Sequence, residues 1–218
     1  MDYGKDFFAY ALKSNQAWAG YKAHQNPDFF PTLARLPQSP QILWLGCSDS
    51  RCPETTILGL ELGDVFAHRN IANIISPTDI NTAAVIQYAV ENLKVKHVVL
   101  CGHSACGGAE TALSEIRVGG VIDTWLMPLK ALYNTHKEEL AVIEDKKAQA
   151  IRLAELNVEA GVKVLLANMS INEAINKQKL QVHGVLFDIG SGRIRDLGVG
   201  TVKGGHKKGI GGQDAEIV

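Results

Sequence analysis

The stretch Ile42-Leu43-Trp44-Leu45-Gly46-Cys47-Ser48-Asp49-Ser50-Arg51 joins a short apolar run to a loop that carries a thiol, a carboxylate and a guanidinium. A continuous apolar run of this length is typical of a parallel strand that is buried on both faces. A second stretch repeats the pattern, because Val98-Val99-Leu100-Cys101-Gly102 runs into His103-Ser104-Ala105-Cys106. Sites in parallel sheets form beyond the carboxyl ends of the strands. We therefore expect Cys47, His103 and Cys106 to meet at one edge of a sheet.

The order of apolar runs and helical spacings along the chain indicates an α/β fold. We expect strands at residues 42–45, 64–68, 96–100, 179–188 and 193–195, a helix capped by Asp79, and two or three helices within 120–168. Strands that alternate with helices in this way predict a mostly parallel central sheet flanked by helices. Residues 5–24 carry aromatic groups at helical spacing, so they predict a helical arm that packs on its own core or clasps a second subunit.

Length and composition predict one domain with appendages. The 218 residues, of which 46% are hydrophobic, divide into an N-terminal helical arm (1–37), an α/β domain (38–200) and a glycine-rich tail (201–218). The 22 basic and 23 acidic residues nearly balance, so we expect neither nucleic acid nor a membrane surface as a partner. No apolar run approaches the ~20 residues of a membrane span. The first eight residues lack the features of a signal or transit peptide, which predicts a cytoplasmic protein.

Two thiols and one imidazole form a ligand set that suits zinc. Three protein ligands leave a fourth position open, as in catalytic zinc sites. A closed site of four thiolates is the alternative, because Cys47 to Cys52 and Cys101 to Cys106 share the same spacing. We favour the first interpretation, because Cys101 extends a buried strand and Pro53 follows Cys52, positions that suit small buried side chains.

Asp49 and Arg51 are two residues apart, a spacing that allows a bidentate ion pair in an extended segment. The alternative is a surface ion pair, which contributes little. Beside a metal ligand the first interpretation gains weight, because an unpaired Asp49 would compete to become the fourth ligand. Pairing with Arg51 predicts that Asp49 acts as a hydrogen-bond acceptor instead.

The residues from Cys47 to Arg51, taken with those from His103 to Gly108, resemble the β-class carbonic anhydrases, especially the fungal members. The resemblance runs from about Gln38 to Gly200 and includes the stretches 68–73 and 154–158. It implies a zinc enzyme that hydrates carbon dioxide reversibly to bicarbonate and a proton. In this family Cys47, His103 and Cys106 would hold one zinc ion per subunit, and Asp49 with Arg51 would form the catalytic pair.

The resemblance also implies a substrate pocket, a topology and an assembly. Gln38 would bind an oxygen of the substrate or product, and Phe66, Ile71 and Tyr88 would line the carbon dioxide pocket, partly from the neighbouring subunit. The sheet would carry one antiparallel edge strand. The subunits would form homodimers through a swapped N-terminal arm, or homotetramers.

One position departs from the family pattern. Some members bind bicarbonate in a second pocket, for which Trp44 and Arg69 match, whereas Phe187 stands where a tyrosine is expected. Two other functions remain as alternatives at this point. One is a hydrolase of carbon disulfide or carbonyl sulfide on the same fold, and the other is a non-catalytic zinc protein or bicarbonate sensor.

Overall fold

The computed structural model describes residues 6–114 and 117–201, which form two compact units divided after Gln38. The first unit holds α1 (Phe7–Gln25) and α2 (Phe29–Arg35). Helix α1 begins after Asp6, whose carboxylate accepts hydrogen bonds from the N–H groups of Phe8 and Ala9, both at 3.0 Å. Within this unit the rings of Trp18 and Phe30 meet edge to face at 5.6 Å. The predicted tail lies, apart from Thr201, outside the described residues.

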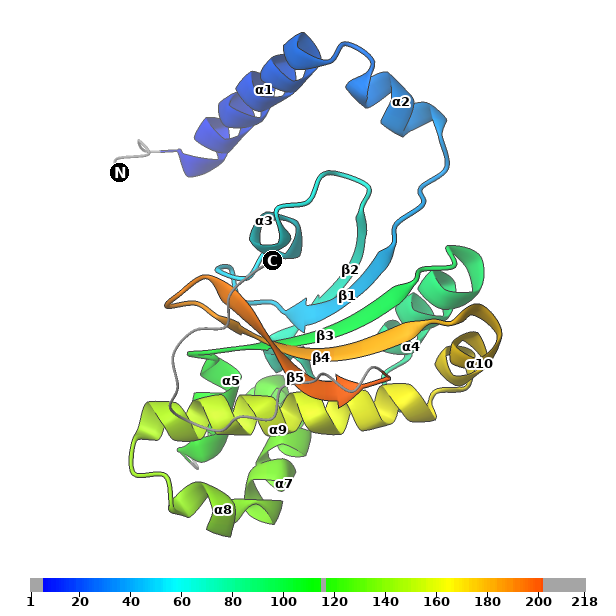
Figure 1. Cartoon of the computed structure of the whole chain (residues 1–218). Coiled ribbons are helices and arrows are strands. Elements are labelled where there is room, and N and C mark those ends of the chain that lie inside the picture. The colour runs from blue at the N-terminus through cyan, green and yellow to red at the C-terminus, as the bar shows by residue number, and fades with distance from the viewer. Residues whose placement is uncertain (1–5, 115–116, 202–218) are drawn as a thin grey trace. The chain divides into compact units, whose positions relative to one another are not determined.

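The second unit is built on one five-stranded sheet in the order β2-β1-β3-β4-β5 (Figure 1). The strands are β1 (Ile42–Cys47), β2 (Val65–Asn70), β3 (His97–His103), β4 (Gln181–Asp188) and β5 (Arg193–Gly200). The first four are parallel neighbours, and β5 runs antiparallel to β4 at the edge. The predicted fold class is therefore confirmed.

Ten helical segments flank the sheet within the described residues of the second unit. They are α3 (Glu54–Leu58), η1 (Ile71–Asn73), α4 (Ile80–Gln87), η2 (Tyr88–Asn92), α5 (Gly107–Leu113), α6 (Gly120–Trp125), α7 (Met127–Thr135), α8 (Lys137–Ala141), α9 (Lys146–Ala167) and α10 (Met169–Gln178). Asp79 caps α4 as predicted. The prediction of two or three helices within 120–168 is wrong, because four occur there. Their short breaks carry no strong punctuation, so apolar spacing alone does not separate them.

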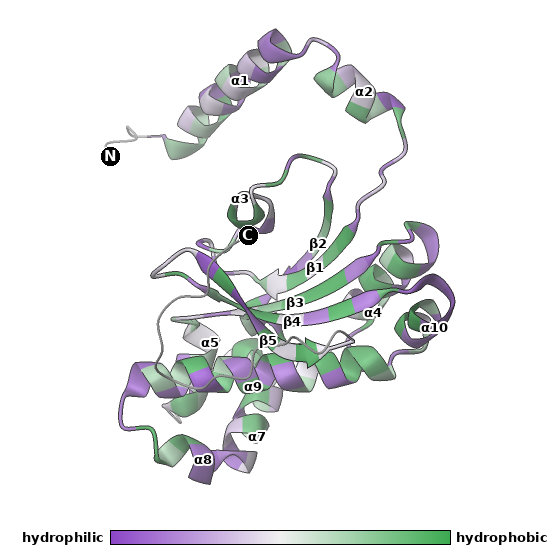
Figure 2. Cartoon of the chain, in the orientation of Figure 1, coloured by the Kyte–Doolittle hydropathy of each residue, from purple (hydrophilic) through white to green (hydrophobic). Residues whose placement is uncertain are grey.

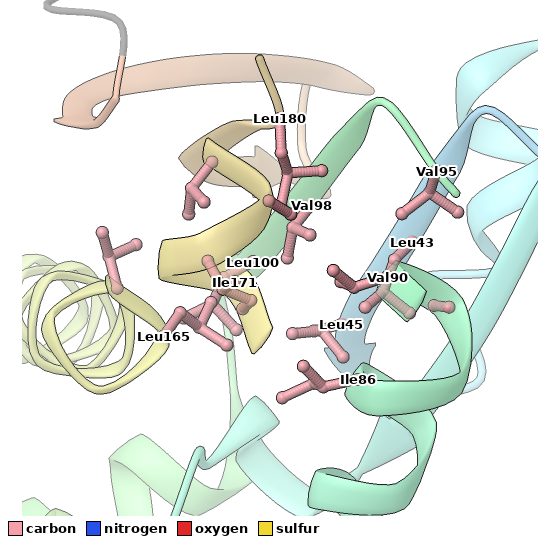
Figure 3. Close-up of a cluster of buried hydrophobic side chains, with 14 of the residues drawn as sticks. Leu43, Leu45, Ile86, Val90, Val95, Val98, Leu100, Leu165, Ile171 and Leu180 are labelled. Atoms are coloured by element: carbon pink, nitrogen blue, oxygen red, sulfur yellow. The ribbon is translucent and has the colours of Figure 1, made fainter. Parts of the chain in front are cut away.

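The two faces of the sheet bury different clusters. Leu43, Leu45, Val98 and Leu100 point to the face covered by α4, α9 and α10 (Figures 1 and 3). Along α9, hydrophobic and hydrophilic residues alternate, as expected for a helix with one face on the sheet (Figure 2). The opposite face buries Trp44, which is 1% exposed, and α3 packs there. None of the helices within the described residues has both the length and the apolar character needed to cross a membrane.

Strand register brings the two motif loops together. Leu45 of β1 pairs with Leu100 of β3, so the carboxyl ends of these adjacent parallel strands lie side by side. Cys47 is the last residue of β1, and His103 is the last residue of β3. Cys106 follows in the short connection to α5. The sheet therefore delivers the predicted ligands to one edge.

Candidate active site

Cys47, His103 and Cys106 form a compact cluster of possible metal ligands. Their ligand atoms all lie within 4.8 Å of one another, and among the described residues no other group of this kind occurs. The three residues are 7%, 2% and 4% exposed, respectively. Burying two thiols and an imidazole so close together costs free energy if any of them lacks a polar partner. The cost is removed when the three groups share a cation or protons.

The protonation of the cluster reflects this crowding. A hydrogen bond from Cys106 lowers the pKa of Cys47 to about 4, against the raising effect of burial. The same hydrogen bond, together with burial, raises the pKa of Cys106. Although burial lowers the pKa of His103, the nearby sulfur atoms of Cys47 and Cys52 raise it to about 10. The cluster thus combines a thiolate with protons that a divalent cation would displace.

His103 is oriented for metal binding. Its Nδ1 lies 2.9 Å from the carbonyl oxygen of Ser104, so Nδ1 donates there and Nε2 is the ligand atom. Nε2 is buried and has no hydrogen-bond partner among the described residues. An orphaned imidazole nitrogen beside two sulfurs fits zinc, which accepts both ligand types at a tetrahedral centre.

Cys52 and Cys101 do not join the cluster. Both are buried with Trp44, Val185 and Phe187 on the face of the sheet that α3 covers. Burial raises the pKa of Cys101 to about 12, which keeps this thiol protonated. The alternative of a closed four-thiolate site is therefore not supported.

Asp49 and Arg51 form the predicted bidentate pair. Arg51 Nε donates to Asp49 Oδ1 at 2.9 Å, and Nη2 donates to Oδ2 at 2.7 Å. The backbone is a turn and not the expected extended segment, because the N–H of Arg51 also donates to Oδ1 at 2.9 Å. This side-chain contact holds the pKa of Asp49 well below its usual range. Asp49 lies outside the ligand cluster, as expected for an acceptor held by arginine.

A cavity of about 360 Å³ opens beside the cluster. Cys47, Asp49 and Cys106 contribute to its wall. The remaining wall is mostly apolar or small, and comprises Ile71, Ala72, Gly107, Gly108, Val118, Ile122 and Leu126, with Ser48 and Thr111. An apolar cavity with one carboxylate suits a small uncharged substrate.

The residues predicted for the substrate pocket are only partly brought together. Ile71 lines the cavity, whereas Phe66 and Tyr88 do not, and their rings contact each other at 5.8 Å. Gln38 belongs to the first unit, so its role stays a prediction. Sequence reasoning missed Val118, Ile122 and Leu126, because nothing in their spacing points to the loops that carry Cys47, His103 and Cys106.

The three residues of the predicted second pocket share one side of the sheet. Trp44 and Phe187 belong to one buried cluster, and Arg69 is in register with Gly46 beside them. Arg69 Nε and Nη2 donate to the carbonyl oxygens of Cys47 and Asp49 at 2.8 and 2.5 Å. Trp44 Nε1 is buried without a hydrogen-bond partner in the described ranges.

Three other histidines, all in strands of the sheet, have structural partners. His68 Nε2 lies 3.0 Å from Thr82 Oγ1, and burial lowers its pKa. His97 Nδ1 lies 3.1 Å from His183 Nε2, at the opposite end of β3 from the ligand cluster. These contacts give the three histidines structural partners away from the ligand cluster.

Comparisons with known proteins agree with this geometry. A family model described as "Carbonic anhydrase" matches residues 42–194. The chain is 40% identical over 189 residues to a carbonic anhydrase of Emericella nidulans, covering 86% of this chain and 82% of that protein. It also matches a chain from the crystal structures of two tetrameric β-carbonic anhydrases from Sordaria macrospora, with a TM-score of 0.89 and 69% identity. This match covers 90% of the present chain and 99% of the matched chain. For the β-carbonic anhydrase CafA of Aspergillus fumigatus the TM-score is 0.85 and the identity 50%, with coverages of 88% and 91%.

Proposed function

Because this chain belongs to the β-class carbonic anhydrases, we propose that it catalyses the reversible hydration of carbon dioxide to bicarbonate and a proton. One observation carries the proposal. Three buried ligand atoms that fit zinc lie beside a carboxylate held by arginine, and both border one apolar cavity. The relatives named carbonic anhydrase do not favour the alternatives of carbon disulfide or carbonyl sulfide hydrolysis, or of a non-catalytic zinc protein.

The ligand residues and the ion pair have separate tasks in this reaction. Cys47, His103 and Cys106 would hold zinc, which would supply a Lewis acid that lowers the pKa of a water and so provides the nucleophile. Asp49 accepts a hydrogen bond from the nucleophilic oxygen and thereby directs a lone pair towards the carbon. Arg51 keeps Asp49 ionised and fixes both of its oxygens, which prevents the carboxylate from turning towards the metal.

The apolar wall favours carbon dioxide over the charged product. Ile71, Val118, Ile122 and Leu126 offer no hydrogen bond to an anion, so bicarbonate gains little by remaining in the cavity. We further propose that Gln38 binds a substrate or product oxygen. In this scheme Phe66 and Tyr88 complete the pocket of a neighbouring subunit.

We propose a homodimer or homotetramer. The Sordaria macrospora relative is tetrameric, and α1 exposes large side chains such as Phe8 and Tyr21, whose apolar surface a second copy could bury. We further propose a cytoplasmic location without nucleic-acid or membrane partners; the near balance of basic and acidic residues supports the absence of such partners.

The second bicarbonate pocket is weakened in this chain. Trp44 Nε1 and Arg69 offer donors there, but Phe187 lacks the hydroxyl of a tyrosine, a loss of about 1 kcal/mol of hydrogen bonding. Inhibition by bicarbonate, compared between the parent protein and Phe187→Tyr, tests this idea. Identical inhibition curves would show that the position does not matter.

The decisive experiment measures carbon dioxide hydration by stopped flow together with zinc content. We expect one zinc per chain in the parent protein and in Asp49→Asn. The variant should hydrate carbon dioxide at least about tenfold more slowly. Asp196→Asn, on the exposed edge strand, serves as the matched control and should keep the parent rate. A zinc-replete but inactive parent protein would reject the proposed function, and an active Asp49→Asn would reject the role of the carboxylate.

A further inference from the structure

Two stretches that resemble the family outside the metal loops, residues 68–73 and 154–158, meet in the fold. Asn157, on α9, donates a hydrogen bond from Nδ2 to the carbonyl oxygen of Ala72 at 2.9 Å, although the two residues are 85 positions apart. Ala72 lies in η1, which follows β2 directly. Neither the metal cluster nor the ion pair gives these residues a task.

The backbone of η1 is held in an unusual conformation. Ala72 has φ 60° and Asn73 has φ 43°, the left-handed region that non-glycine residues rarely adopt. Asn70 brackets the segment, because its side chain both donates to and accepts from the backbone of Ile74 at 2.9 Å. Strained backbone of this kind persists only where surrounding contacts fix it, and it is concentrated at functional sites.

This conformation directs one N–H group at a metal ligand. The N–H of Ala72 donates to Cys47 Sγ at 3.3 Å. On the other side of the same peptide unit, Trp125 Nε1 donates to the carbonyl oxygen of Ile71 at 2.8 Å. Trp125, the Ile71–Ala72 peptide and the Cys47 sulfur therefore form one continuous hydrogen-bond chain, in which each bond polarises the next. Asn157 fixes the following peptide.

We propose that Trp125 and Asn157 are positioning residues that clamp the strained 71–73 segment, so that its N–H remains bonded to the Cys47 sulfur and sets how strongly that sulfur donates to the metal. Hydrogen bonds to ligand sulfurs and the orientation of ligands by outer contacts tune both metal affinity and electronic properties. The inference rests on the metal centre of the proposed function, but it concerns metal binding and not turnover.

Two variants remove the clamp with little change in shape. Trp125→Phe keeps an aromatic ring and loses the N–H, while Asn157→Leu keeps a side chain branched at Cγ and loses the donor. Val158→Ala is the control, because Val158 lies next to Asn157 on α9 but its side chain faces Gly102 and Gly184 of the sheet. All four proteins are loaded with cobalt for absorption spectra and with zinc for release to an excess of chelator, and their thermal unfolding is recorded.

Loss of the clamp should move the thiolate-to-cobalt charge-transfer band of both clamp variants to lower energy, because a sulfur without its N–H donor holds its electrons less tightly. Zinc affinity should fall by about 10-fold to 100-fold. Parent-like spectra and zinc release in both variants would overturn the proposal. Equal shifts in Val158→Ala, at a similar loss of thermal stability, would also overturn it. If the protein did not hydrate carbon dioxide, the cobalt spectra, zinc release and thermal unfolding would still test the clamp, because none of them depends on that reaction.

Discussion

Arg51 Nη2 donates a hydrogen bond to the carbonyl oxygen of Ala105 at 3.0 Å, which joins the two loops that carry the metal ligands. The same guanidinium holds both oxygens of Asp49. Ala105 has φ 54°, a left-handed backbone conformation that residues other than glycine rarely adopt, and this conformation presents its carbonyl to Arg51. Arg51 therefore fixes the carboxylate relative to the metal ligands, and not merely its charge.

Replacement of Arg51 by lysine tests this geometric role. Lysine keeps the positive charge but cannot reproduce a planar fork that serves two carboxylate oxygens and a carbonyl. We expect Arg51→Lys to retain one zinc per chain and to lose about tenfold or more of the hydration rate, measured by stopped flow. Arg193→Lys, exposed at the start of β5, should behave as the parent protein. Parent activity in Arg51→Lys would show that charge alone suffices.

Close packing at Gly108 gives a second prediction. A Cβ atom at this position would lie 2.7 Å from the Cβ of Ala72, within the segment that donates to Cys47. We expect Gly108→Ala to lower the free energy of unfolding by about 1–3 kcal/mol and to reduce hydration, because α5 and the 71–73 segment must separate. Urea unfolding and stopped-flow assays measure the two effects. Gly107→Ala is the matched control for the unfolding measurement, because nothing lies within 4 Å of its added Cβ. Equal effects of the two substitutions would contradict the packing explanation.

The division of the four cysteines predicts the outcome of a double substitution. Cys52→Ala combined with Cys101→Ala should keep one zinc per chain, since both thiols are buried in the cluster with Trp44, Val185 and Phe187 and neither belongs to the ligand group. Thermal stability should fall because each substitution leaves a small cavity. Cys106→Ala should instead lose most of the zinc, as measured by elemental analysis. Loss of zinc from the Cys52/Cys101 double variant would revive the four-thiolate site.

The hydrogen bonds of Asp188 lead us to expect that the folded protein loses stability in acid. Its carboxylate accepts hydrogen bonds from Ser191 Oγ at 2.7 Å and Ser104 Oγ at 2.8 Å, which lower its pKa. A group with a lowered pKa in the folded protein stabilises it above the pKa of the unfolded chain, and this contribution is lost as the pH falls through the folded value.

Urea unfolding should therefore give the parent protein and Asp188→Asn free energies of unfolding that differ by about 1 kcal/mol at pH 7. The two values should converge below about pH 4. Asp196→Asn is the control: it neutralises a carboxylate that accepts a hydrogen bond from the Gly198 N–H, and it should give a smaller difference at pH 7. A difference between the parent protein and Asp188→Asn that stays constant from pH 7 to pH 3 would argue against a contribution from ionised Asp188.

The amino-acid sequence by itself determined the ligand set, the ion pair and the fold class. These features depend on local properties: apolar runs specify buried strands, each motif directly follows a strand, and thiol and imidazole chemistry selects the metal. Only the tertiary structure decided which side chains complete the site. Val118 and Leu126 reach the cavity, Trp125 and Asn157 reach the 71–73 segment, and Arg51 reaches Ala105, in each case through chain packing that no spacing along the sequence records. Such contacts form only when distant segments share one core, which is why sequence patterns alone cannot locate them.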